Sequence, residues 1–180
     1  MNTGRNNYER YEKDPCLRPC RGDGTGPAYR LRHRSSASHK SIAKAMEDFD
    51  RNFEKNSNIT YTSSAEWDAK LQQLAAKPGF ETVVKAVYNS DDTILSRIRS
   101  NLSGSLTHSG KVVYFYCGKY DKDAGKQAIN LNAHYAYINT SNTDLAGERQ
   151  IGLITTSFTD TNGKKVKVRF AVVVSDYPNP

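Results

Sequence analysis

The sequence has no long run of apolar residues. Its longest uninterrupted stretch of aliphatic residues and phenylalanine covers only residues 170–174, which is the length of a β-strand. A helix that spans a bilayer needs roughly 18–20 apolar residues, so no membrane span is predicted. The first 14 residues, MNTGRNNYERYEKD, contain no apolar segment of the kind found in signal peptides. We therefore expect no secretory signal peptide in this chain.

Cysteine is also scarce, with only Cys16, Cys20 and Cys117 in 180 residues. The first two have the spacing C-x3-C, but no second cysteine pair and no nearby histidine completes a set of four zinc ligands. Free thiols or one local disulfide explain these cysteines better than a metal does. We therefore predict no metal site.

The common nucleotide-binding and hydrolytic signatures are missing as well. The sequence contains no G-x-x-x-x-G-K-[ST], no G-x-S-x-G, no H-E-x-x-H and no G-x-G-x-x-G. These absences disfavour P-loop enzymes, serine hydrolases of the α/β type, zinc proteases and dinucleotide-binding domains. We expect no bound cofactor.

The chain does have an excess of positive charge, with 26 Lys and Arg against 19 Asp and Glu, a net charge of +7. The net charge is +5 over residues 1–40, −1 over residues 41–110 and +3 over residues 111–180. A basic surface attracts polyanions such as RNA, DNA or an acidic protein. The alternative is that the charge serves solubility alone.

The composition divides the chain into an arm and a domain. Residues 1–37 are rich in Arg, Gly, Asn, Ser and Pro and poor in aliphatic residues, which predicts a polar basic arm or linker. Residues 38–180 have the patterning of an α+β domain, with helices over 38–104 and a sheet over 111–177.

Helical spacing of apolar residues predicts four helices, over residues 38–55, 63–77, 80–88 and 90–104. The second would begin with a capping box formed by Ser63 and Glu66 and would end before Pro78.

Alternation then predicts four strands, over residues 112–117, 129–137, 150–158 and 164–177, with a hairpin turn at Asn162-Gly163. In the last strand one face is aliphatic, and we expect it to be buried with Trp67 and Ile98. The sequence therefore predicts N-terminal helices packed on a C-terminal antiparallel β-sheet. The residues expected on the aliphatic face are Val166, Val168, Phe170, Val172 and Val174.

Two of the four histidines are candidates for proton transfer. The expected strand places His134 on a polar face with Asn130 and Asn132, where an imidazole acts as an acid or base near neutral pH. His39 lies at the start of the first helix, on the side of its apolar stripe. The alternative for each histidine is an exposed side chain without a task.

A second candidate cluster lies on the last strand. Lys167, Arg169, Ser175 and Tyr177 have the same parity and so share a face. Cations that stabilise a phosphorane and hydroxyls that orient a phosphate are what cleavage of RNA by its own 2′-OH requires. The alternative is a solvated strand face rich in Lys and Arg.

The ending FAVVVSDYPNP resembles the final strand of the metal-independent ribonuclease toxin domains of bacterial polymorphic toxins. These include the RNase A-like and EndoU-like contact-dependent inhibition toxins. The resemblance implies that the Ser-x-Tyr-Pro motif, with Ser175 in place of the usual Thr, supplies active-site hydroxyls together with Tyr177. The segment SASHKS is similar to the early histidine motif of those families, which implies a catalytic role for His39. Lys167 and Arg169 are chosen from strand parity and not from the family.

Three functions follow as hypotheses. The first is a toxin domain that acts as a metal-independent endoribonuclease on RNA. Such a domain would be neutralised by a cognate immunity protein. It would be secreted or delivered into a target-cell cytoplasm as part of a larger effector. The second is a non-enzymatic nucleic-acid-binding or coat-type structural protein whose basic arm neutralises phosphates. The third is a protein-binding module whose sheet edge pairs with a partner strand.

Overall fold

The computed structural model describes residues 37–91, 93–94, 96, 110–137 and 145–177. The chain divides into two units, residues 1–33 and 34–180, and the account below concerns the second. The expected arm except for Ala37 lies outside the described residues, and Cys16 and Cys20 lie outside them with it. So do Ile98 and most of the helix expected over 90–104. At the predicted start of that helix, Asp91 Oδ1 accepts a hydrogen bond from the Ile94 amide at 3.2 Å.

Five strands form one sheet in the order β1-β4-β5-β2-β3. β4 and β5 are joined by the predicted Asn162-Gly163 turn, in which Gly163 has a φ of +75°. β1 pairs with β4 in parallel and the other three pairs are antiparallel, so the sheet is mixed and not purely antiparallel. The strand bounds are β1 Thr60–Ser63, β2 Lys111–Lys119, β3 Tyr135–Tyr137, β4 Glu148–Thr159 and β5 Lys165–Asp176.

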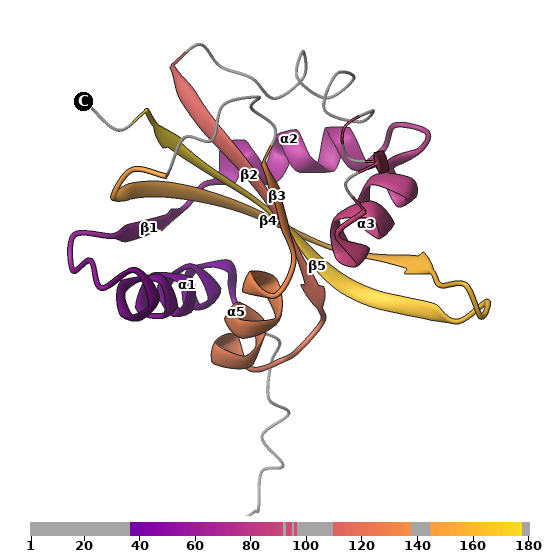
Figure 1. Ribbon diagram of the computed structural model, residues 1–180, viewed down its shortest axis with the longest axis horizontal. Coiled ribbons are helices and arrows are strands. Elements are labelled where there is room, and N and C mark those ends of the chain that lie inside the picture. The colour runs from indigo at the N-terminus through magenta and orange to yellow at the C-terminus, as the bar shows by residue number, and fades with distance from the viewer. Residues whose placement is uncertain (1–36, 92, 95, 97–109, 138–144, 178–180) are drawn as a thin grey trace, which may run out of the picture. The chain divides into compact units, whose positions relative to one another are not determined.

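The helices cover both faces of this sheet, with α1 and α5 on one side and α2 and α3 on the other (Figure 1). Helices come early in the chain and most strands late, which confirms the α+β class. Their bounds are α1 His39–Glu54, α2 Ala65–Ala75, α3 Phe80–Asn89 and α5 Ala124–Asn132. None of the helices in the described part of the chain is long and apolar enough to cross a membrane.

The first core lies between the sheet and the pair α2 and α3. Val168, Phe170, Val172 and Val174 of β5 are buried there together with Trp67, as the alternation predicted, and Val166 is half-buried. The strand register is therefore confirmed, because a slip of one residue would have exposed the whole set.

A second core lies on the other face, where the sequence predicted a polar surface. That prediction is wrong: Ala171 and Val173 of β5 are buried against Ile42 of α1 and Leu131 of α5. The physical reason is the uninterrupted run 170–174, because a strand that is covered on both faces has no polar side to alternate with. Arg169 and Ser175 of the same face are buried as well.

The strand expected over 129–137 is a helix for its first part. α5 begins after Asp123, whose side chain accepts the Lys126 amide at 3.0 Å and caps the helix. Ala128 and Leu131 are buried at helical spacing, whereas Ile129 is exposed. The apparent alternation was a coincidence of a short helix followed directly by a three-residue strand.

β1 was not predicted. Ser63, expected to cap a helix, is the last residue of β1, and the cap of α2 is Ser64, whose Oγ accepts the Trp67 amide. β1 is held from the α1 side by Glu47, which accepts the Tyr61 amide at 3.0 Å.

Two glycines let helices approach the sheet closely, one on each face. A Cβ on Gly118 of β2 would lie 2.4 Å from the backbone of Asn130 in α5, and a Cβ on Gly152 of β4 would lie 2.5 Å from the backbone of Trp67 in α2. Any other residue at these positions would push a helix away from the sheet.

Candidate functional site

The four residues of the candidate cluster on the last strand lie at two ends of the sheet. Lys167 and Arg169 are near the start of β5, and Ser175 and Tyr177 are at its end. Six to ten residues separate the first two from the last two, which is about 20–33 Å at the rise of a β-strand. The structure therefore does not bring this cluster together, although its members share a face of the strand.

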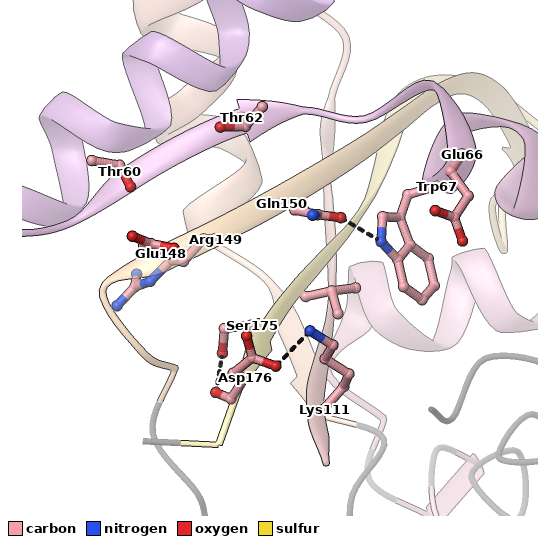
Figure 2. A pocket seen from close by; sticks show the side chains of 11 residues that line it. Thr60, Thr62, Glu66, Trp67, Lys111, Glu148, Arg149, Gln150, Ser175 and Asp176 are labelled. Atoms are coloured by element: carbon pink, nitrogen blue, oxygen red, sulfur yellow. Dashed lines mark hydrogen bonds and ion pairs between the residues drawn. The ribbon is translucent and has the colours of Figure 1, made fainter. Parts of the chain in front are cut away.

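Ser175 borders a pocket of about 580 Å³ at the end of the sheet (Figure 2). Its hydroxyl is buried, accepts the Ala146 amide at 3.1 Å and donates to the Asp176 carbonyl at 3.0 Å. Ser175 thus fixes the chain entering β4 against the end of β5. The neighbouring Tyr177 is partly exposed, and its amide donates to the Gly110 carbonyl at 3.1 Å.

The chemistry of this pocket is not suited to phosphate. Its walls carry the carboxylates of Glu66, Glu148 and Asp176, and Lys111 pairs with Asp176 (Figure 2). Arg149 also borders the pocket, but its guanidinium pairs with carboxylates of α1 on the opposite face of the sheet. The excess of negative charge repels polyanions.

His134 lies just before β3, which is the edge strand opposite β1. Its ring packs on Tyr88 of α3 with centroids 5.2 Å apart, and its carbonyl accepts the Cys117 amide at 2.9 Å. β5 and β2 separate it from β4, a distance of about 14 Å at the usual strand spacing. These contacts give His134 a packing role against the last turn of α3.

His39 forms the most specific polar contact of the candidate residues. Its Nδ1 lies 2.9 Å from Oδ2 of Asp68 in α2, and Oδ1 of Asp68 accepts the Leu153 amide of β4 at 2.7 Å. β1 pairs with β4 only along Glu148–Ile151, and beyond Ile151 no described strand pairs with this edge of β4. The contact between His39 and Asp68 joins α1 to α2 beside this unpaired part of the edge. The His39 side chain is 40% exposed and that of Asp68 23%.

This geometry sets the state of the imidazole. A carboxylate oxygen can only accept, so Nδ1 of His39 carries the proton that is donated to Asp68. In the neutral ring Nε2 is then the acceptor, as in catalytic histidines that are oriented by an aspartate. His39 borders a cavity of about 320 Å³ together with Gln72, Thr155 and other residues of β4.

Cationic groups lie close to this cavity. Arg169 is the Cα partner of Thr155, and its Nη2 donates at 3.1 Å to the Ala37 carbonyl, two residues before His39. Lys167 Nζ lies 4.0 Å from the centroid of the Tyr120 ring, and the Arg169 guanidinium lies 5.2 Å from the same centroid. Burial lowers the pKa of Arg169 below its ordinary value, and Tyr120 opposes the shift. A guanidinium stays protonated in proteins, so the side chain is a cation.

The start of α1 adds to the positive potential. Ser38 caps the helix by accepting the Ser41 amide at 3.1 Å, and His39 is the first helical residue. A helix N-terminus carries a partial positive charge that favours anions. His39 is therefore an imidazole oriented by Asp68 at the positive end of a helix.

The sequence patterns singled out His39 and not its partner Asp68. Asp68 has no local signature in the sequence, so only the placement of α1 and α2 reveals the pair. Within the described residues, no group of three or more His, Cys, Asp and Glu is arranged to hold a metal ion. Comparisons with protein-family models, with curated proteins and with solved structures find no match.

Proposed function

We propose that this domain is a ribonuclease that needs no metal, with His39 as its proton-transfer residue. The observation that supports the proposal best is the contact between His39 Nδ1 and Asp68 Oδ2, with the carboxylate itself held by the Leu153 amide. The Leu153 amide fixes the Asp68 carboxylate, and the carboxylate in turn fixes the orientation of the His39 ring. General base catalysis requires a base held in a fixed orientation.

In the proposed reaction Nε2 of His39 removes the proton of the RNA 2′-OH, whose oxygen attacks the adjacent phosphorus and forms a 2′,3′-cyclic phosphate. The bond from phosphorus to the 5′-oxygen of the next nucleotide breaks, and this oxygen takes a proton from water and leaves as a 5′-hydroxyl. His39 then returns its proton to the solvent. Asp68 stabilises the imidazolium that forms. The exposed Lys167 attracts the phosphodiester, and the charge of the buried Arg169 acts through space to offset the developing negative charge. Ser175 and Tyr177 have no part in this step, because they lie about 20 Å or more along β5 from Arg169.

The biological setting in the proposal comes from the resemblance to bacterial toxin domains. A delivered endoribonuclease needs a cognate immunity protein in the cell that makes it. Inducible expression of the chain without such a partner should arrest growth and fragment cellular RNA. Expression of His39→Ala should do neither.

The decisive experiment is cleavage of a labelled RNA by the purified chain at low salt with EDTA present. His39→Ala should reduce the rate by about 10²–10⁴. His134→Ala is the matched control, because that ring packs on Tyr88 away from Asp68, and it should cleave at a rate near wild type. If His39→Ala cleaves as fast as the unchanged chain, the proposal is wrong.

Asp68→Asn refines the same test. The amide oxygen of Asn can still accept the Leu153 amide, so the fold is kept, but a neutral group no longer stabilises the imidazolium. Activity should fall while the thermal midpoint changes little. Cleavage should also weaken as salt rises, because phosphate binding releases counterions.

Nucleic-acid binding without cleavage is the second candidate function. It is favoured by Lys167 and Arg169, which lie beside the ring of Tyr120, since cations next to an aromatic ring suit the binding of single strands. In this case RNA remains intact, anisotropy reports binding that falls with salt, and Lys167→Ala weakens binding whereas His39→Ala does not.

A further inference from the structure

A third cavity, of about 640 Å³, lies at the other end of α1 from His39. It is bounded by the last two turns of α1, by β2, by the start of β3 and by the segment that leads into β4. We call it the aromatic groove. Its lining residues include Phe49, Phe53, Tyr114, Tyr116 and Tyr135.

Aromatic rings form both walls of the groove. Phe49 and Phe53 stack on α1 with centroids 6.1 Å apart. On the sheet, Tyr114, Tyr116 and Tyr135 form a triangle whose centroids are 5.9–6.3 Å apart. Two of these rings are open to solvent, Phe53 with 78% of its surface exposed and Tyr135 with 56%.

The floor of the groove is charged, with an excess of negative charge. The buried guanidinium of Arg149 donates to Asp50 at 2.7 Å and to both carboxylate oxygens of Glu54 at 2.9 Å. Two carboxylates against one cation leave one negative charge among the lining residues. α1 ends at Glu54, so the negative end of the helix dipole adds to this potential.

Glu54 is in a position to bind a further donor. Its side chain is 39% exposed, and each carboxylate oxygen has lone pairs beyond the one that accepts from Arg149. Arg149 itself lies 5.7 Å from the ring of Tyr61 while it pairs with Glu54, so the protein already binds one guanidinium between an aromatic ring and this carboxylate.

We propose that the aromatic groove binds an arginine side chain of a protein partner. The faces of Phe53 and Tyr135 attract the cation, and Glu54 accepts its N–H groups. Arginine fits better than lysine, because a planar guanidinium stacks on rings and pairs with a carboxylate through two donors. A nucleotide is disfavoured, because its phosphate meets a negative floor.

The groove is separate from the proposed ribonuclease site. His39 and Phe53 are fourteen residues apart on α1, which is about 21 Å at the helical rise. The two proposals therefore fail independently: loss of arginine binding should leave RNA cleavage unchanged, and loss of cleavage in His39→Ala should leave arginine binding unchanged.

The test is a titration of the ¹⁵N-labelled protein, followed by amide chemical shifts, with the peptide Gly-Arg-Gly blocked at both ends. Shifts should concentrate at Phe53, Glu54 and Tyr135. The matched probe Gly-citrulline-Gly has nearly the same shape without the charge and should cause much smaller shifts. Adenosine monophosphate is the third probe and should not bind here.

Three variants complete the test. Phe53→Ala and Tyr135→Ala remove exposed rings, so they should fold normally and weaken binding by about fivefold each. Glu54→Gln should weaken it similarly, whereas Asp48→Asn, on the same helix but outside the groove, should not. Equal binding of citrulline and arginine, tighter binding of adenosine monophosphate, or unchanged binding in both ring variants would overturn the proposal.

Discussion

Arg149→Met tests the buried ion network that joins α1 to β4. In the native domain Arg149 is buried and donates to Asp50, Glu54 and the Ala146 carbonyl, at 2.9 Å for the last. Methionine has a similar length and fills the space, so the substitution removes charge and hydrogen bonds more than volume. Asp50 then remains buried without its cation.

Breaking a buried pair by removing one partner costs about 3–5 kcal/mol. The lower end applies here, because Asp50 keeps the Tyr61 hydroxyl at 2.6 Å and the partly exposed Glu54 can turn to water. A loss of about 3 kcal/mol should lower the urea midpoint by about 1.5 M, if the unfolding slope is near 2 kcal/mol per M. Burial raises the pKa of Asp50, so part of the loss should be relieved at acidic pH as that carboxyl takes up a proton.

Urea unfolding followed by circular dichroism measures this loss. Adding Asp50→Asn to Arg149→Met should restore about 1–2 kcal/mol, because no buried charge is then left without a partner. Lys111→Met, which breaks the exposed pair with Asp176, is the control and should cost less than 1 kcal/mol. A loss below 1 kcal/mol in Arg149→Met would refute the reasoning, as would a double variant no more stable than the single one.

Three further predictions concern other buried groups. The hydrogen bond from Lys44 lowers the pKa of Glu47 below its ordinary 4.5, so its contribution to stability is present above that pH and is lost as pH falls. The unfolding midpoints of Glu47→Gln and the native chain should therefore differ at pH 7 and converge in acid. Gly152→Ala should cost about 1–3 kcal/mol in urea unfolding through overpacking against Trp67, and a neutral result would contradict the close approach. Burial raises the pKa of Cys117 to about 12, so peptide mapping should find it unalkylated by iodoacetamide in the native state and alkylated after unfolding.

Local sequence patterns were sufficient to predict a helix or strand when the element had a clear capping or turn residue and regular spacing of its apolar residues. α1, α3 and the β4–β5 hairpin were predicted because their apolar spacing and turn residues agree. α5 was not predicted, because the alternation from Ile129 onward predicted a strand and the helix cap at Asp123 was not recognised. β1 was missed because four residues carry little pattern, and its pairing with β4 joins segments about ninety residues apart.

The candidate site was only partly predictable for a similar reason. Parity correctly placed Lys167 and Ser175 on one face, but parity gives no information on distance along a strand. The contact between His39 and Asp68 requires α1 and α2, which cover opposite faces of the sheet, to meet at its edge. Such a contact is a property of the tertiary arrangement and leaves no trace in a window of sequence.

The position of β5 has a consequence for how the domain is made. β5 is the middle strand of the sheet, yet it is the last of the described strands to be synthesised. Until β5 emerges from the ribosome, β4 and β2 have no strand between them. The helices on both faces of the sheet then lack the β5 side chains against which they pack. Folding therefore has to wait for the end of translation of this domain, and the incomplete chain exposes two strand edges during that time. A binding partner that covers these edges early would act as a chaperone as well as a ligand.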